Sequence, residues 1–156
     1  DAQRQDLTVN YRSPAEIHEL AVAVLADYAP SIAPSVAIRA SGFIPEFRRV
    51  SDTAAEIDVS VEQALDAVGG LVAVIGAQAE TLESAHRLAD SDAGRVRFLT
   101  PNQAKGLEFD AVVLIEPIDI WSSGGGAAQL YIALTRATQR LTIVHCRDLP
   151  VPLQPH

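Results

Sequence analysis

The chain contains a single lysine, Lys105, in a polar stretch (residues 100–110) that lies between two apolar runs. Residues 95–100 before it are expected to form a strand. Residues 111–116 after it form a continuous apolar run, which is typical of a strand buried on both faces. Gly106 follows the lysine and permits close approach of the backbone to a ligand. Together these features indicate a phosphate or nucleic-acid site at the end of a strand.

Composition limits the class of protein. The chain has 156 residues, of which 48% are hydrophobic and 5% aromatic, so we expect one domain with an aliphatic core. No apolar run approaches the roughly 20 residues of a membrane span, and no membrane association is expected. The single cysteine, Cys146, excludes an internal disulfide and favours the cytoplasm. The absence of methionine favours a fragment of a longer chain, although a processed N-terminus would look the same.

The formal net charge of -8 argues at first against a nucleic-acid partner. Its distribution weakens that objection, because residues 51–94 contain nine acidic residues and one basic residue. Residues 95–147, which hold the candidate motifs, contain six basic and four acidic residues. The acidic segment is interpreted as a solvated helical surface, with a basic partner protein as the alternative.

Strands and helices alternate along the sequence, which predicts an α/β fold with a parallel sheet. Strands are expected at residues 5–10, 46–50, 71–75, 95–100, 111–116 and 141–145, and helices at residues 13–30, 52–68, 78–90 and 127–139. Ser13 and Pro14 are expected to begin the first helix, and Ser51 or Asp52 to cap the second.

The last helix is expected to carry a polar flank formed by Gln129, Arg136 and Arg140. The glycine run before it (residues 122–126) lacks the Gly-Lys-Ser/Thr ending of a phosphate-binding loop, so we predict a mobile loop. Residues 148–156 are rich in proline and are predicted to be an exit linker and not a folded element.

Three segments resemble one family in their order and spacing. LTVNYRSP (residues 7–14) resembles motif IV of superfamily 1 helicases of the UvrD/Rep type, QAKGLEFD (residues 103–110) resembles motif V, and LYIALTRA (residues 130–137) resembles motif VI. The resemblance implies that residues 1–147 form the second RecA-like motor domain, a three-layer α/β/α sandwich with a mainly parallel sheet.

The resemblance also implies roles in ATP binding. Arg12 and Arg136 would be the guanidiniums that stabilise the transferred phosphoryl group of ATP. Arg136 could instead be a surface arginine paired with an acid. Tyr11 would stack on the adenine, or be a half-buried core aromatic. Glu108 would accept a hydrogen bond from the ribose, or cap a helix or pair with Lys105.

The resemblance also implies that residues between 100 and 106 contact either the nucleotide or single-stranded nucleic acid, the polymer on which the motor acts. Gly106 would allow the backbone to approach the nucleotide. Thr100 and Asn102 occupy positions that bind single-strand phosphates in the family. The family usually has histidine at position 102, which puts this contact in doubt. Lys105 could bind nucleic acid or bridge to the nucleotide cleft.

The sequence contains no Gly-x-x-x-x-Gly-Lys-Ser/Thr loop and no apolar strand ending in an Asp-Glu pair. By resemblance, a first, N-terminal motor domain would supply these and the Mg²⁺ ligands, so this chain alone should not hydrolyse ATP. The solitary histidines have no metal-ligand spacing. The expected partners are that N-terminal domain and single-stranded DNA. The sequences of motifs V and VI are also similar to those of HelD-like proteins, which implies RNA polymerase as an alternative partner. A third hypothesis is a non-enzymatic interaction module.

Overall fold

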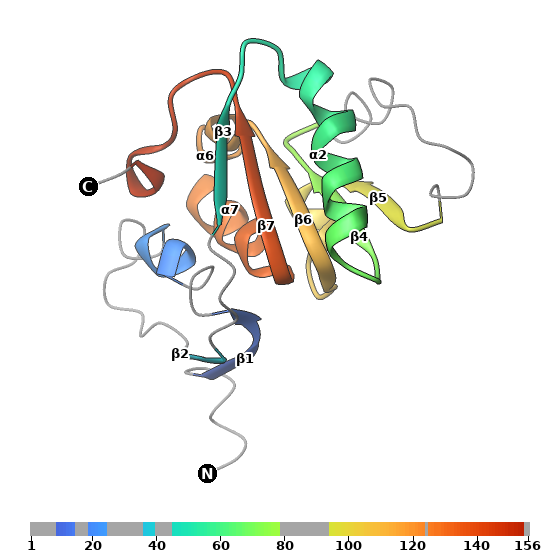
Figure 1. Ribbon diagram of the computed structural model, residues 1–156. Helices are drawn as coiled ribbons and strands as arrows, with labels where there is room; N and C mark the ends of the chain where they lie inside the picture. The colour runs from blue at the N-terminus through green and yellow to red at the C-terminus, as the bar shows by residue number, and fades with distance from the viewer. Residues whose placement is uncertain are drawn as a thin grey trace.

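The computed structural model describes residues 9–14, 19–24, 36–39, 45–78, 94–123 and 125–154. Their central feature is a five-stranded parallel sheet in the order β3-β7-β6-β4-β5 (Figure 1). The strands are β3 (Glu46–Arg49), β4 (Val72–Ile75), β5 (Val96–Leu99), β6 (Phe109–Ile115) and β7 (Ala137–His145). The predicted α/β class with a mainly parallel sheet is confirmed.

Strand β6 lies at the centre of this sheet, between β4 and β7. All of its residues except Asp110 are buried, as the continuous apolar run predicts. Its register places Val112 beside Ala73 of β4 and Leu141 of β7. The strand that follows the lysine motif is therefore a buried central strand of the sheet.

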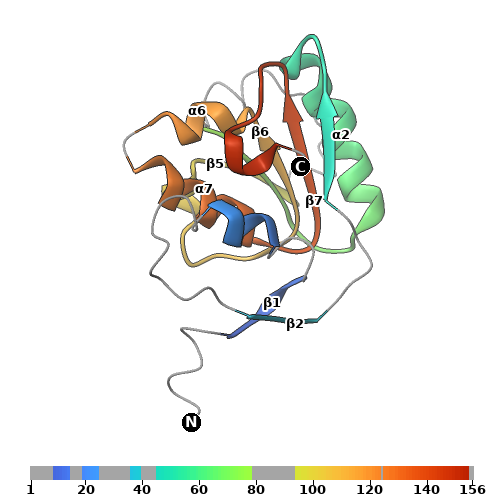
Figure 2. The same cartoon turned by 90° about the vertical axis from the view of Figure 1, so that its left-hand side faces the viewer.

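Helices cover both faces of the sheet and give the predicted three-layer arrangement (Figure 2). Helix α2 (Thr53–Ala67) covers one face. The short helix α6 (Pro117–Trp121), helix α7 (Gly126–Thr135) and helical residues 19–24 cover the other. The four-residue helix α5 (Pro101–Ala104) packs beside α7.

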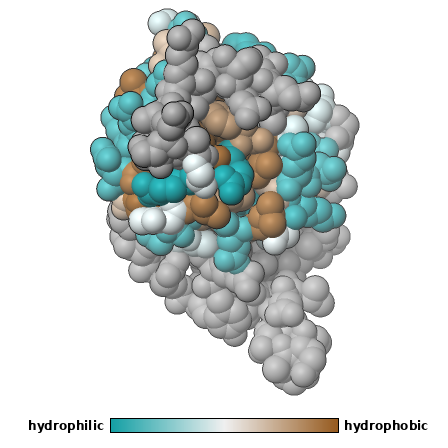
Figure 3. Space-filling model, turned by 90° about the vertical axis from the view of Figure 1, so that its right-hand side faces the viewer, coloured by the Kyte–Doolittle hydropathy of each residue, from teal (hydrophilic) through white to brown (hydrophobic). Residues whose placement is uncertain are grey.

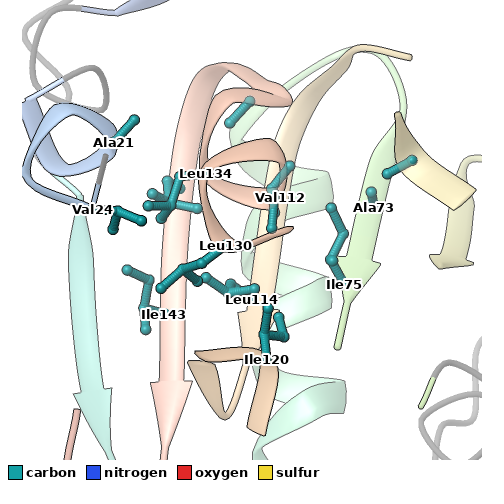
Figure 4. Close-up of a cluster of buried hydrophobic side chains, with 14 of the residues drawn as sticks. Ala21, Val24, Ala73, Ile75, Val112, Leu114, Ile120, Leu130, Leu134 and Ile143 are labelled. Atoms are coloured by element: carbon teal, nitrogen blue, oxygen red, sulfur yellow. The ribbon is translucent and has the colours of Figure 1, made fainter. Parts of the chain in front are cut away.

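Each face has its own hydrophobic core. On the α7 side, Leu130 and Leu134 of the helix pack on Val112, Leu114 and Ile143 of the sheet (Figure 4). On the α2 side, the predicted apolar stripe is buried; it consists of Ile57, Val61, Ala64, Leu65 and Val68. The cores contain many small aliphatic side chains, which suits close packing of helices on a sheet.

Helix α2 begins after Asp52, whose side chain accepts a hydrogen bond from the amide of Ala55 at 3.4 Å, as predicted for its cap. Its acidic residues Glu62 and Asp66 are exposed. The exposure of these two side chains agrees with the interpretation of the acidic segment as a solvated helical surface. Seen from the right-hand side of Figure 1, apolar residues are bordered by hydrophilic ones (Figure 3).

The predicted end of the last helix is wrong. Helix α7 ends at Thr135, and residues 137–139, expected to be helical, form the start of β7. The local pattern continues as a helix, but the carbonyl of Arg136 accepts a hydrogen bond from the amide of Phe109 at 2.9 Å. Pairing with β6 therefore outweighs helix propensity at this point.

The predicted start of the first helix is also wrong. Ser13 and Pro14 belong to β1 (Val9–Pro14), which pairs in parallel with β2 (Val36–Arg39) in a separate two-stranded sheet. A residue before proline favours extended backbone, and pairing with β2 uses that preference. Helical structure is described for residues 19–24. The predicted helix at residues 78–90, most of the predicted strand at residues 5–10, and Pro30 lie outside the described residues.

The C-terminal segment departs from the expected linker. Residues Val151–Leu153 form a 3-10 turn, and Leu153 is buried in the core on the α7 side. The side-chain amide of Gln154 donates a hydrogen bond to the carbonyl of Leu149 at 2.9 Å. Burial of Leu153 outweighs the extended preference of the neighbouring prolines. The boundary at residue 147 stays a prediction.

Candidate functional site

The structure brings Glu108 and Arg136 together at the N-terminal ends of two neighbouring strands. Phe109 begins β6, Ala137 begins β7, and these two residues lie opposite each other in the register. The amide of Phe109 donates to the carbonyl of Arg136 at 2.9 Å. Glu108 and Arg136 therefore occupy equivalent positions, one residue before each strand.

The side chain of Arg136 is held by oxygen atoms from two segments. Its Nη1 donates to the carbonyl of Leu107 at 3.1 Å, and its Nε donates to the carbonyl of Ile132 at 3.1 Å. Its Nη2 donates to Oγ1 of Thr135 at 3.1 Å. These contacts fix a guanidinium plane beside the backbone of Glu108. We call residues 107–109 together with Arg136 the junction.

Gly106 shapes the approach to the junction. It has a φ of 83°, a conformation that L side chains rarely adopt. The next amide, that of Leu107, donates to the carbonyl of Ala104 at 3.0 Å. The glycine therefore allows the chain to turn out of α5 and enter β6. The predicted approach of this backbone to a nucleotide stays a prediction.

Thr100 lies at the other end of the same segment. Its hydroxyl accepts from the amide of Gln103 at 3.2 Å, and its amide donates to Oε1 of Gln103 at 2.9 Å, which forms a capping box on α5. A hydroxyl that accepts this bond still carries a hydrogen that it can donate to a phosphate oxygen. Asn102 and Lys105 are exposed on or beside α5.

Thr100 and Glu108 are separated along the strands. Leu99 is level with Ile75 of β4, and Ile75 is level with Leu114 of β6. Leu114 lies five residues beyond Phe109, about 17 Å at the rise of a parallel strand. Thr100, assigned to the polymer, and Glu108, assigned to the nucleotide, therefore lie at opposite ends of one short segment, with Lys105 and Gly106 between them.

Tyr11 and Arg12 belong to β1, and β1 lies beside β7 (Figures 1 and 2). The side chains of both residues lie outside the described part of the molecule. Their predicted contacts with adenine and phosphate stay predictions.

Comparison with known proteins identifies the segment that contains the junction. The family model of the UvrD-like helicase C-terminal domain matches residues 95–144. These residues are similar to that family, and we call them the UvrD-like segment. The UvrD-like segment thus covers β5, α5, β6, α6, α7 and nearly all of β7. The resemblance of motifs V and VI to UvrD-type helicases is confirmed.

Two solved structures align with most of the chain. The first is the C-terminal domain of a possible DNA helicase from Lactobacillus plantarum, with a TM-score of 0.62 and 21% identity over 93% of this chain and 92% of that one. It shares the fold of this chain. The second is the arterivirus nonstructural protein 10 helicase, with a TM-score of 0.41 and 19% identity over 88% of this chain and 25% of that one. A search of curated proteins gave no match.

The glycine run before α7 in the UvrD-like segment has a packing role. A Cβ on Gly126 would lie 2.0 Å from the carbonyl oxygen of Trp121 at the end of α6. Gly125 has a φ of 72° and precedes the first residue of α7. These glycines permit the close connection between α6 and α7, so the backbone here is constrained by packing.

Arg140 does not share a flank with Gln129 and Arg136, because it belongs to β7 and not to a helix. Its Nη2 lies 3.3 Å from Oε1 of Glu46, and Oε2 of Glu46 lies 2.7 Å from Nε of Arg48. These arginines, Arg48 before Arg140, hold the pKa of Glu46 below its ordinary value. Arg48 also binds Glu56, Ser60 and Gln63 of α2, so this network joins the edge strand to the helix layer.

A groove of about 880 Å³ lies between residues 19–24, β3 and the C-terminal turn, and its lining includes Phe47, Arg49, His145 and Leu153. None of the predicted site residues whose side chains the structure describes lines it. Within the described ranges, no group of three His, Cys, Asp or Glu residues is arranged to hold a metal ion. In those same ranges no helix is long and apolar enough to cross a membrane.

Sequence reasoning missed the two threonines that flank Arg136. Thr135 receives a hydrogen bond from the Arg136 guanidinium, and its own hydroxyl lies 2.9 Å from the carbonyl of Tyr131. The hydroxyl of Thr138 donates to the carbonyl of Phe109 at 3.2 Å. The only signal in the sequence was the spacing of two hydroxyl side chains around the motif VI arginine, and the partner of Thr138 is 29 residues away in the chain.

Proposed function

We propose that this chain is the second motor domain of an ATP-dependent superfamily 1 DNA helicase. The fold shared with a helicase C-terminal domain and the family of residues 95–144 support the class of protein. The observation that carries the proposal is the junction, where the guanidinium of Arg136 donates to the carbonyl of Leu107, the residue next to Glu108. A cation for phosphate and a carboxylate for ribose are thereby adjacent.

The junction suits a nucleotide on physical grounds. ATP supplies the phosphoryl group, and negative charge increases on that group during transfer to water. A guanidinium binds two oxygens of such a group in a fixed plane and keeps its proton at every physiological pH. In the proposed function Arg136 holds that charge, and Glu108, which is exposed, accepts a hydrogen bond from the ribose.

Arg12 and Tyr11 complete the proposed nucleotide site. The position of β1 beside β7 supports this assignment, since Arg136 directly precedes β7. Arg12 is the proposed second arginine finger, and Tyr11 is the proposed adenine contact. The first motor domain would bind most of the nucleotide and supply the Mg²⁺ ligands, so closure of the two domains would bring these arginines to the phosphates.

The proposed polymer is single-stranded DNA. Thr100 and Asn102 lie at the start of the segment that leads to Glu108, Lys105 follows α5 directly before Gly106, and each of the three carries a hydrogen-bond donor. Phosphate binding through these residues would link the polymer to the nucleotide site through α5 and Gly106. The cytoplasm is the proposed location. Remodelling of RNA polymerase, which the HelD-like resemblance implies, stays a prediction.

The test uses the protein in which this chain is joined to a first motor domain. Arg136→Ala should abolish DNA-stimulated ATP turnover, while nucleotide affinity stays within about threefold, because the arginine acts on charge that develops during the reaction. Arg97→Ala is the control, since Arg97 is an exposed arginine of β5 whose side chain donates, among the described residues, to the backbone carbonyls of Gly94 and Val96. Unchanged turnover in Arg136→Ala would refute the proposal.

A further inference from the structure

The first residues of β7 do not pair regularly with β6. Phe109 lies opposite Ala137, and Ala111 lies opposite Arg140. One residue of β6 therefore faces two residues of β7, Thr138 and Gln139. Regular pairing from Ala137 onward would place Gln139 opposite Ala111. The extra residue of β7 between Ala137 and Arg140 makes a β-bulge. Bulges are frequent next to active sites because they redirect side chains.

Strand β6 is irregular at the same level. The amides of Asp110 and Ala111 both donate to the carbonyl of Leu71, at 3.0 and 3.3 Å. In a regular strand Phe109 and Ala111 would share a face, but Phe109 is buried on the α7 side and Ala111 on the α2 side. The irregularity turns Phe109 toward α7 directly after Glu108.

Thr138 fastens the bulge to the junction. Its hydroxyl donates to the carbonyl of Phe109 at 3.2 Å, while the amide of Phe109 donates to the carbonyl of Arg136 at 2.9 Å. Both backbone polar groups of Phe109 are thus bound by residues on either side of Ala137. On the other side of Glu108, the carbonyl of Leu107 accepts from the Arg136 guanidinium.

We propose that Thr138 is a positioning residue for the Arg136–Glu108 pair. This inference rests on the proposed function and assigns Thr138 no contact with ATP. Without the hydroxyl, the bulge loses the side-chain bond that ties it to Phe109, and the starts of β6 and β7 can shift relative to each other. Displacement of reacting groups by about 1 Å can lower a rate by about 100-fold, so a small shift is sufficient.

The test compares Thr138→Val, which keeps the shape and removes the hydroxyl, with Thr138→Ser, which keeps the hydroxyl. In the protein joined to a first motor domain, Thr138→Val should lower the kcat of DNA-stimulated ATP hydrolysis by about tenfold and change KM for ATP by less than about twofold. Thr138→Ser should restore most of kcat. Thr142→Val is the matched control, because Thr142 is a buried threonine of the same strand that lies level with Val113, away from the junction.

A second measurement needs no ATPase activity. In the 156-residue chain, hydrogen exchange of the Phe109 amide should accelerate at least about tenfold in Thr138→Val and stay near the wild-type rate in Thr142→Val. Wild-type kcat and wild-type exchange in Thr138→Val would overturn the inference, as would an equal loss of kcat in Thr138→Ser or Thr142→Val. Turnover that is indifferent to Arg136→Ala would instead contradict the proposed function, and the exchange experiment would still decide whether Thr138 holds the junction.

Discussion

Arg136 and Leu107, 29 residues apart in the chain, are joined by a hydrogen bond of 3.1 Å from the guanidinium to the carbonyl. The same guanidinium donates to Thr135 and Ile132, so its plane is set by three acceptors. A lysine carries the same charge but has no planar fork of donors. The junction therefore depends on the shape of the arginine as well as on its charge.

Arg136→Lys tests this dependence. In the protein that contains both motor domains, it should lower ATP turnover by about 10³-fold, the loss expected for an arginine finger. It should also lower the free energy of unfolding of the 156-residue chain by about 1–2 kcal/mol, because several hydrogen bonds are lost. Steady-state kinetics and urea unfolding measure the two effects. Turnover within about threefold of wild type would show that charge alone suffices; Arg97→Lys is the control for the substitution itself.

Gly126→Ala tests the packing between α6 and α7. The added Cβ would lie 2.0 Å from the carbonyl oxygen of Trp121 and 2.7 Å from that of Ile120, so the backbone must move. We expect a loss of about 2–4 kcal/mol in the free energy of unfolding, as for other overpacked or strained sites.

Gly69→Ala is the matched control for Gly126→Ala. A Cβ at Gly69 would have no atom within 4 Å, and its φ lies outside the left-handed region. This substitution should leave stability unchanged or raise it by up to about 1 kcal/mol, because the unfolded chain loses conformational freedom. Equal effects of the two substitutions in urea unfolding would contradict the packing argument.

Arg95→Met tests how α2 is joined to β5. Arg95 donates from Nη2 to the carbonyls of Val68 at 2.8 Å and Leu65 at 3.3 Å, and from Nε to the carbonyl of Gly70 at 3.2 Å. These are acceptors at and beyond the C-terminal end of α2, where a cation is favoured. The loss should be about 1–3 kcal/mol. Arg97→Met, two residues farther along the chain in β5, should change stability by less than about 0.5 kcal/mol.

The elements that the sequence predicted best are those whose pattern is local. The apolar run at residues 111–116 predicted the buried central strand, and the stripe from Ile57 to Val68 predicted the buried face of α2. The roles that the motif residues predicted at a nucleotide site stay predictions. The structure adds that Glu108 and Arg136 are adjacent, because β6 and β7 pair in parallel at that point.

The predictions that were wrong depend on contacts between distant residues. Ala137, Thr138 and Gln139 continue a helical pattern, and only pairing of Phe109 with Arg136 ends α7 at Thr135. Ser13 was expected to cap a helix, but β1 pairs with β2 through Pro14. The role of Thr138 depends on a bulge between strands, and a bulge leaves no periodic signal in one sequence.

Glu46→Gln tests the network at the edge of the sheet through pH. Arg48 first, and then Arg140, lower the pKa of Glu46 from its ordinary value of 4.5. A carboxylate with a lowered pKa in the folded state stabilises the fold above that ordinary value, and this contribution disappears as the pH falls through the lowered pKa. Wild type should therefore exceed Glu46→Gln in stability at neutral pH, and the difference should shrink below pH 4.5.

The size of this effect is limited by exposure. The side chain of Glu46 is 42% exposed, so solvent screening should keep the difference below about 1 kcal/mol. Urea unfolding from about pH 7 to about pH 3 measures it. In an Arg48→Met background most of the pH dependence of the difference should vanish, because Arg48 makes the closest ion pair with Glu46, at 2.7 Å. A difference that grows as the pH falls would have the opposite sign and would contradict the assigned pairing.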